Sequence, residues 1–186
     1  MTHTIENMIL ISCLGCMLLF AALIDLKSRK IPNLITLPSI LTALIYHSAV
    51  NGMDGFIFGL AGMFVGIALM ILPYLLGGAG AGDAKLLGAI GAVIGVHNVL
   101  QAFIYIAFTG LGSLILLLIF KRKQYGIYFM RHIIMIKAVL YTGKIFHVPA
   151  LPEETQASKI SYGAIIALGT IVYIVFQATG NNLITI

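Results

Sequence analysis

Long runs of apolar residues dominate this sequence, and their length is what most limits the fold. A membrane-spanning helix needs about 20 predominantly apolar residues, and six runs approach or reach that length. The chain is 60% hydrophobic and 9% charged, which is typical of integral membrane proteins rather than soluble ones. We therefore expect an all-α integral membrane protein forming one domain over residues 1–186. The predicted spans lie at about 8–24, 34–50, 55–76, 86–100, 101–120 and 161–179.

The limits of the fourth span are the least defined by the sequence. The run 86–100 is short for a full crossing, so it is either tilted within glycine-rich packing or begins earlier, across Asp83. Only the polar pair His97-Asn98 marks the boundary with the fifth span. The first seven residues contain no Lys or Arg, so we interpret the first run as a retained anchor rather than a cleaved signal peptide.

Basic residues are distributed unevenly over the connections between the predicted spans. With six spans and the N-terminus outside, all 11 Lys and Arg residues fall on the cytoplasmic side, and the positive-inside rule then predicts an N-out, C-out topology. A net charge of +5 could indicate nucleic-acid binding, but charges along a membrane surface favour anionic lipids as partners. The basic residues are Lys27, Arg29, Lys30, Lys85, Lys121, Arg122, Lys123, Arg131, Lys137, Lys144 and Lys159.

The segment at about 124–148 is apolar but carries basic residues at intervals. This pattern predicts an amphipathic helix lying at the cytoplasmic interface, because a seventh span would place Lys159 and the C-terminus on the wrong sides. The following stretch, 149–159, contains Glu153 and Glu154 and is expected to be a cytoplasmic loop.

Glycines and cysteines inside the spans have structural explanations. Rows of glycine at helical spacing let helix backbones approach closely in lipid. Cys13 and Cys16 lie on one face of an apolar helix, and no further Cys could complete a four-thiolate zinc site, so no metal and no cofactor are expected. The glycine rows are Gly55, Gly59, Gly62 and Gly66 on the third span and Gly88, Gly91 and Gly95 on the fourth.

Two of the six acidic residues, Asp25 and Asp83, lie directly against span ends on the basic side. The threading places both at the same, cytoplasmic depth, where a carboxylate beside a membrane segment indicates a functional site. The alternative is structural: Asp25 could anchor a helix end by pairing with Lys27 or Arg29, and Asp83 could be a helix N-cap paired with Lys85.

The glycine-rich turn before Asp83 argues against a plain N-cap. A cap does not require Gly78, Gly80 and Gly82, whereas these residues permit positive φ angles and the close approach of another backbone, such as a bound peptide. We therefore expect a specialised turn at this position.

Three motifs in order resemble the type IV prepilin peptidases. The stretch Asp25-Leu-Lys-Ser-Arg-Lys-Ile-Pro32-Asn33 is similar to their Asp-x6-Pro-Asn motif. The stretch Gly80-Ala-Gly82-Asp83-Ala-Lys85-Leu is similar to their Gly-x-Gly-Asp-x-Lys-Leu motif. The start of the last span, Ser161-Tyr162-Gly163, resembles their Pro-Tyr/Phe-Gly signature with Ser in place of Pro. The resemblance extends over essentially the whole chain and is greatest to the short form that serves Tad/Flp-type pilus systems.

This resemblance implies an intramembrane aspartyl endopeptidase of the inner membrane. Its catalytic residues would be Asp25 and Asp83, and the substrate cleft would be supported by Pro32, Asn33, Gly80, Gly82 and Lys85. The implied substrates are prepilins and pseudopilins, cut on the cytoplasmic side after a short basic leader. Larger members carry paired CxxC motifs in a cytoplasmic region and also methylate the new N-terminus. Cys13 and Cys16 lie within a span instead, so methyl transfer is not part of the expected activity.

Two neighbouring carboxyl groups can share one proton, so that one activates water while the other protonates the leaving amine. Helix dipoles suggest that Asp83, at a helix start, is the base and that Asp25, at a helix end, is the acid. A rival hypothesis is a small transporter or proton relay using the same two aspartates, although relay acids are expected nearer mid-bilayer. A third is a catalytically silent assembly subunit.

Overall fold

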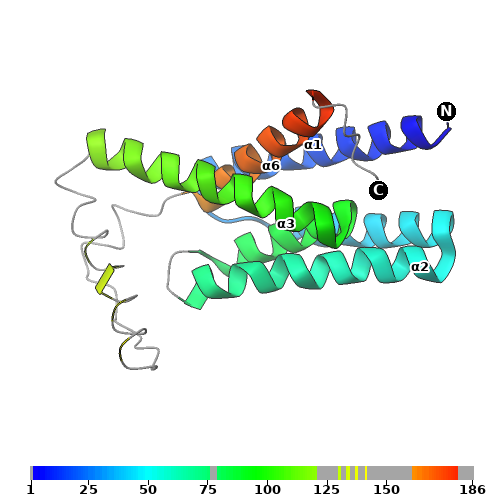
Figure 1. Ribbon diagram of the computed structural model, residues 1–186, viewed down its shortest axis with the longest axis horizontal. Coiled ribbons are helices and arrows are strands. Elements are labelled where there is room, and N and C mark those ends of the chain that lie inside the picture. Colours follow the sequence, from blue (N-terminus) through cyan, green and yellow to red (C-terminus); the bar gives the residue numbers. More distant parts are fainter. Residues whose placement is uncertain are drawn as a thin grey trace.

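The computed structural model describes residues 2–75, 79–120, 130, 133–134, 137, 141 and 161–179. Within this part of the chain there are helices and short connections but no strands. The helices are α1 (Thr2–Ser28), α2 (Asn33–Leu75), α3 (Ala81–Phe120) and α6 (Tyr162–Thr179), and Figure 1 shows them side by side in one bundle. All four are long and apolar enough to cross a membrane, which confirms the all-helical membrane fold at this level.

Helix α2 is a hairpin rather than one rod. Its 43 residues would extend about 65 Å at 1.5 Å per residue, roughly twice the thickness of the hydrocarbon core. The helix breaks at Gly52, where φ is 60° and ψ is −136°, a conformation that favours glycine. Beyond this break the chain reverses, so that a methyl group at Gly59 would lie 3.0 Å from the side chain of Leu44. Figure 1 shows the two arms, 33–51 and 53–75, running in opposite directions.

Helix α3 reverses in the same way at Gly95, where φ is 79°. The phenyl ring of Phe58 occupies the space of a side chain there, so glycine is required for room as well as for conformation. The first arm, 81–94, and the second arm, 96–120, both approach the start of α6. Asp83 interacts electrostatically with Tyr162, and Gly110 lies near Ile165.

The reversal at Gly95 corrects one predicted boundary. The break between the fourth and fifth segments lies at Gly95, whereas the sequence placed it after Leu100. The fourth segment begins at Ala81, with Asp83 inside its first turn, which is one of the two alternatives that the sequence left open. The physical reason is that the polar pair His97-Asn98 folds into the helix, with the Asn98 side chain donating a hydrogen bond to the carbonyl of Ile94 (2.8 Å). The number of membrane crossings and their orientation remain predictions.

The first arm of α3 is the centre of the bundle. Every residue from Leu86 to Gly95 is buried, which is expected of a helix that is apolar on all sides. Its glycine row packs against the second arm of α2: methyl groups at Gly62 and Gly91 would each overlap the other's carbonyl group. The close packing predicted for the two glycine rows is thus confirmed at these positions.

A network of neutral polar side chains joins the second arm of α3 to α6. The hydroxyl of Tyr173 donates to the side-chain oxygens of Asn98 (3.0 Å) and Gln101 (3.2 Å). The Gln177 amide also donates to Gln101 (2.9 Å). This far-end network, defined as Asn98, Gln101, Tyr173 and Gln177, lies next to the Gly95 reversal and holds α6 antiparallel to the second arm of α3.

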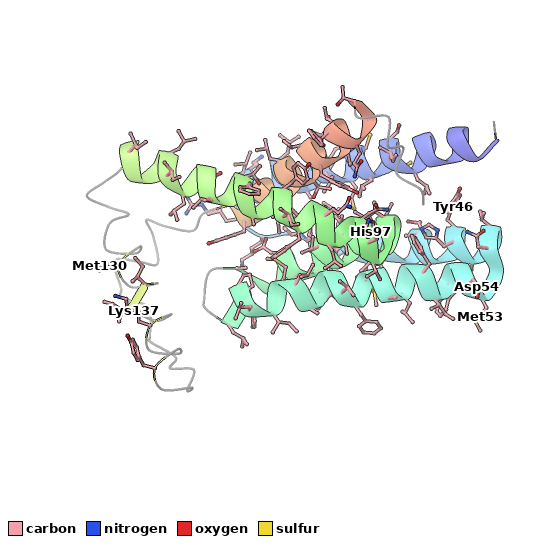
Figure 2. The ribbon with its side chains drawn as sticks, viewed as in Figure 1. Tyr46, Met53, Asp54, His97, Met130 and Lys137 are labelled. Carbon is pink, nitrogen blue, oxygen red and sulfur yellow. The ribbon has the colours of Figure 1, made fainter. Side chains whose placement is uncertain are left out.

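Most of the predicted interfacial segment, 124–148, and the loop at 149–159 lie outside the described residues. Those described within it are helical, and Met130, Lys137 and Tyr141 are exposed. Figure 2 shows Met130 and Lys137 at the end of the molecule opposite Met53 and Asp54.

Candidate active site

Asp25 lies near the C-terminal end of α1, where the helix is closed by local backbone geometry. Arg29 adopts a left-handed conformation with φ of 52°, and its N–H donates to the carbonyl of Asp25 (2.7 Å). The Ser28 hydroxyl donates to the carbonyl of Ile24 (2.8 Å). A left-handed conformation is unusual for a residue other than glycine and is often found at functional sites. It turns the chain abruptly from α1 towards Ile31 and Pro32, which precede α2.

The Asp25 carboxyl is buried against the first turn of α6 and is only 4% exposed. Its Oδ2 accepts a hydrogen bond from the backbone N–H of Ala164 (3.2 Å). This N–H is one of the first few in α6, which have no partner within their own helix. A side chain on Gly163 would place its Cβ 2.9 Å from the same oxygen, so the absence of a side chain allows the carboxyl to approach.

Asp83 is held by a different helix start, that of α3. Its Oδ2 accepts a hydrogen bond from the backbone N–H of Gly80 (2.7 Å), just before the helix begins at Ala81. This is the carboxylate half of a capping box, in which the third helical residue reaches back to the residue at the cap position. Asp83 is also buried, at 8% exposure.

The two carboxyl groups belong to one site. They are close enough for their charges to interact, although they come from α1 and α3. Ile31 packs between the two turns that hold them, since Cβ atoms built on Gly82 and Gly163 would lie 3.3 Å and 2.7 Å from its side chain. Two buried carboxyl groups at one site can share a proton, which is the arrangement needed for paired acid and base catalysis.

Neither aspartate forms an ion pair with any residue that the structure describes. The side chain of Lys85 instead donates to Oδ1 of Asn33 (2.9 Å), which ties the start of α2 to the first turns of α3. The ion pairs of the alternative interpretation, Asp25 with Lys27 or Arg29 and Asp83 with Lys85, are therefore not found. Its capping role for Asp83 is found in part, because Asp83 caps the start of α3 from the third helical position. Of the predicted supporting residues, Asn33 and Lys85 contact each other, Gly80 binds Asp83, and Pro32 precedes α2.

The expected positive φ angles in the glycine turn are not found at Gly80 or Gly82. Among the described residues, positive φ angles occur at Arg29, Gly52 and Gly95. A Cβ at position 82 would make a tight contact of 3.3 Å with Cβ of Ile31, whereas the Ile31 backbone, at 3.5–3.6 Å, would be at ordinary van der Waals distance. The approach of a bound peptide backbone to this turn stays a prediction.

Among the described residues, no group of three His, Cys, Asp or Glu side chains is placed to hold a metal ion. Cys13 and Cys16 are free thiols exposed on α1, so neither is packed within the bundle.

Three residues of the site were not identified as such from the sequence: Ile31, Gly163 and Ala164. Gly163 belongs to the Tyr-Gly signature at the start of the last span, and this signature could have indicated that it is part of the site. Ile31 lies between two motif residues but is itself unremarkable, and Ala164 contributes only a backbone N–H. Tyr162 also belongs to the site, since it interacts with Asp83.

Comparison with known proteins gives one match. Residues 12–115, more than half of the chain, match the family model of the type IV leader peptidase family. This region includes both aspartates and ends before α6. No curated protein and no solved structure matches the chain.

Proposed function

Because the chain belongs to the type IV leader peptidase family, we propose that it is an intramembrane aspartic endopeptidase in which Asp25 and Asp83 are the catalytic pair. Its substrates are type IV prepilins or pseudopilins, from which it removes a short basic leader at the cytoplasmic face of the inner membrane. The observation that carries this proposal is that two buried carboxyl groups, from α1 and α3, are held by turns that both pack on Ile31, with no cation paired to either among the described residues.

The hydrogen bonds at the site suggest how the carboxyl groups divide their work. The backbone N–H groups of Gly80 and Ala164 each engage Oδ2 of one aspartate, so we assign Oδ1 of each to water and substrate. The ionised carboxylate removes a proton from water, which then attacks the scissile carbonyl carbon. The protonated carboxyl hydrogen-bonds the carbonyl oxygen and afterwards delivers its proton to the leaving amine. The reaction needs no cofactor.

The helix dipoles do not assign the two catalytic roles. Asp25 lies near the carbonyl end of α1, but its side chain also accepts an N–H from the start of α6. The dipoles of α1 and α6 therefore act on Asp25 in opposite directions, and the dipole of α1 alone does not make it the acid.

Six membrane crossings with the N-terminus and C-terminus outside are part of the proposal. The reversals at Gly52 and Gly95 support it, because they make the six helical segments alternate in direction. Of the five described basic residues, Lys27, Arg29, Lys30 and Lys85 lie in or beside the turns that hold the aspartates, which supports a cytoplasmic site facing anionic lipids. The fifth, Lys137, lies in the predicted interfacial segment.

The test of the function is cleavage of a prepilin bearing a basic leader, a glycine and an apolar helix, co-expressed with the enzyme. Asp25→Asn and Asp83→Asn should each leave the precursor at full length. Asp54→Asn is the matched control, because Asp54 is exposed just after the Gly52 reversal, at the end of the molecule opposite Lys137 (Figure 2). Mature pilin in both catalytic variants would refute the assignment, and a transporter or assembly role would then have to be considered.

The topology is tested separately by labelling single cysteines in a variant lacking Cys13 and Cys16. Ser28→Cys should react only with reagents that reach the cytoplasm, and Asn51→Cys should react with an impermeant reagent added outside. Labelling of both from the same side would contradict the six-span arrangement.

A further inference from the structure

We propose that the first turn of α6 positions Asp25 for catalysis, with Gly163 as the positioning residue and the Ala164 N–H as the group that fixes the carboxyl. This inference rests on the peptidase function proposed above. It assigns a role to a part of the chain that lies beyond the region of the family match, which ends at residue 115.

Asp25 has little else to fix its side chain. It is on the last turns of α1, beside the left-handed Arg29, and its own helix offers only carbonyl groups at that end. Within the part of the chain that the structure describes, its carboxyl accepts one hydrogen bond, from the N–H of Ala164, 139 residues away in sequence. A catalytic group must be held within about 0.5 Å of its productive position, so this contact is the means by which Asp25 is oriented.

Gly163 makes the contact possible. An ideal Cβ at this position would lie 2.9 Å from Oδ2 and 3.0 Å from Cγ of Asp25. Real side chains do not sustain separations this short, so an alanine would push the carboxyl away from the Ala164 N–H. The same Cβ would lie 2.7 Å from Cδ1 of Ile31, but that is the flexible end of a side chain and can move aside.

The turn is presented by a helix that is itself fixed. Ile166, Ala167, Gly169 and Thr170 of α6 are buried, and Tyr173 is held by the far-end network. A displacement of Asp25 by a residue at position 163 therefore cannot be relieved easily by movement of α6 as a whole.

The helix also contains a matched control position. Alanine at Gly169 would be more severely crowded, because its Cβ would lie 2.5 Å from Cα of Ile106, a backbone atom, and 2.7 Å from the Thr109 hydroxyl. Gly169 is six residues further along α6 and does not contact either aspartate. Both variants therefore crowd the same helix, Gly169→Ala the more strongly, and only Gly163→Ala acts on the carboxyl.

The experiment measures kinetics and the infrared carboxylate band of Asp25 in purified protein containing ¹³C-labelled aspartate. The band that disappears in Asp25→Asn identifies Asp25. In Gly163→Ala this band should shift and kcat should fall about 10²-fold with KM within about threefold, the size of effect expected for a misplaced catalytic group. Gly169→Ala should leave the band unmoved and kcat within about threefold. Equal losses of kcat in the two variants with the band unmoved in both would overturn the proposal.

A second variant keeps the test decisive if Gly163→Ala folds poorly. Ile31→Val removes Cδ1 and so relieves the crowding with Ile31, while the overlap with Asp25 remains. The double variant Gly163→Ala/Ile31→Val should fold and remain about 10²-fold slow. Recovery of full activity would show that Gly163 serves only to accommodate Ile31, which would refute the positioning role. Cleavage at the wild-type rate by Asp25→Asn would instead refute the proposed function. A shift of the Asp25 band in Gly163→Ala would still report the contact between α6 and Asp25.

Discussion

Two nearly fully buried polar groups lie at opposite ends of the bundle: Tyr173, which belongs to α6, and Asp25, which packs against the start of α6. At the far end, the Tyr173 hydroxyl is bound by Asn98 and Gln101, so neutral side chains satisfy one another. At the other end, the Asp25 and Asp83 carboxyl groups accept hydrogen bonds only from backbone N–H groups among the described residues. The difference is chemical: a closed neutral network fastens helices together, whereas carboxyl groups held by the backbone on one side retain capacity for a substrate.

The largest expected effect comes from neutralising the two aspartates. Asp25→Asn and Asp83→Asn should each reduce kcat by about 10²–10⁴-fold, the contribution typical of a general acid or base. The free energy of unfolding should change by less than about 1 kcal/mol, because an asparagine oxygen can still accept the backbone N–H. Cleavage assays together with thermal unfolding in detergent would show this separation. Unfolding of both variants at a much lower temperature would instead give the aspartates a structural role.

The second-largest effect is expected from changing the packing around the two aspartates. Gly82→Val should slow cleavage by about tenfold or more, because its added methyl groups press on Ile31, and overpacking typically costs about 1–3 kcal/mol. Gly112→Val on the same helix is the control, since a Cβ there meets nothing within 4 Å. Rates of prepilin cleavage would compare them. If the two variants cleave equally fast, the tight packing around Ile31 is not required for activity.

Breaking the far-end network should lower stability and leave the cleavage rate almost unchanged. Tyr173→Phe removes the hydroxyl that binds Asn98 and Gln101, and hydrogen bonds between membrane helices contribute about 0.6 kcal/mol on average and at most about 1.7. Thermal unfolding should therefore shift to a lower temperature while kcat stays within about twofold. A large loss of kcat without loss of stability would mean that the two ends are coupled.

The smallest effect is expected at the contact between Lys85 and Asn33. Lys85→Met retains the aliphatic stem but removes the donor to Oδ1 of Asn33, an exposed bond that should contribute about 0.5 kcal/mol. Cleavage should fall by no more than about threefold. A loss comparable to that of Asp83→Asn would show that Lys85 acts on the carboxyl pair rather than on the junction of α2 and α3.

Asp25 and Asp83 could be selected as candidate site residues because the reasons for choosing them can be read along the sequence alone. Each lies at the limit of an apolar run, and the distribution of basic residues places both limits on one side. The partners of the carboxyl groups could be predicted only in part. The Gly80 N–H is local to Asp83, whereas the Ala164 N–H reaches Asp25 only through tertiary packing of α6 on α1.

The reversal at Gly95 was missed for a related reason. Composition favours a break at polar residues, and His97-Asn98 are the polar residues of that region. The actual break depends on the Phe58 ring, which fills the space beside Gly95 and comes from a different helix. Gly95 was expected to allow close helix packing. Its second role, adopting a positive φ angle, cannot be recognised from the sequence.

The hydrogen bond between Ala164 and Asp25 also sets an order in time. The two residues are 139 positions apart, so at 5–20 residues per second the ribosome adds Ala164 roughly 7–28 s after Asp25. During that interval α1, α2 and α3 can enter the membrane and bring Asp83 into place, but the group that orients Asp25 does not yet exist. The nascent chain therefore becomes a competent peptidase only after its last described helix has been made and docked. Synthesis of α6 is the step that switches the enzyme on, and a ribosome that stalls before it leaves an inactive protein in the membrane.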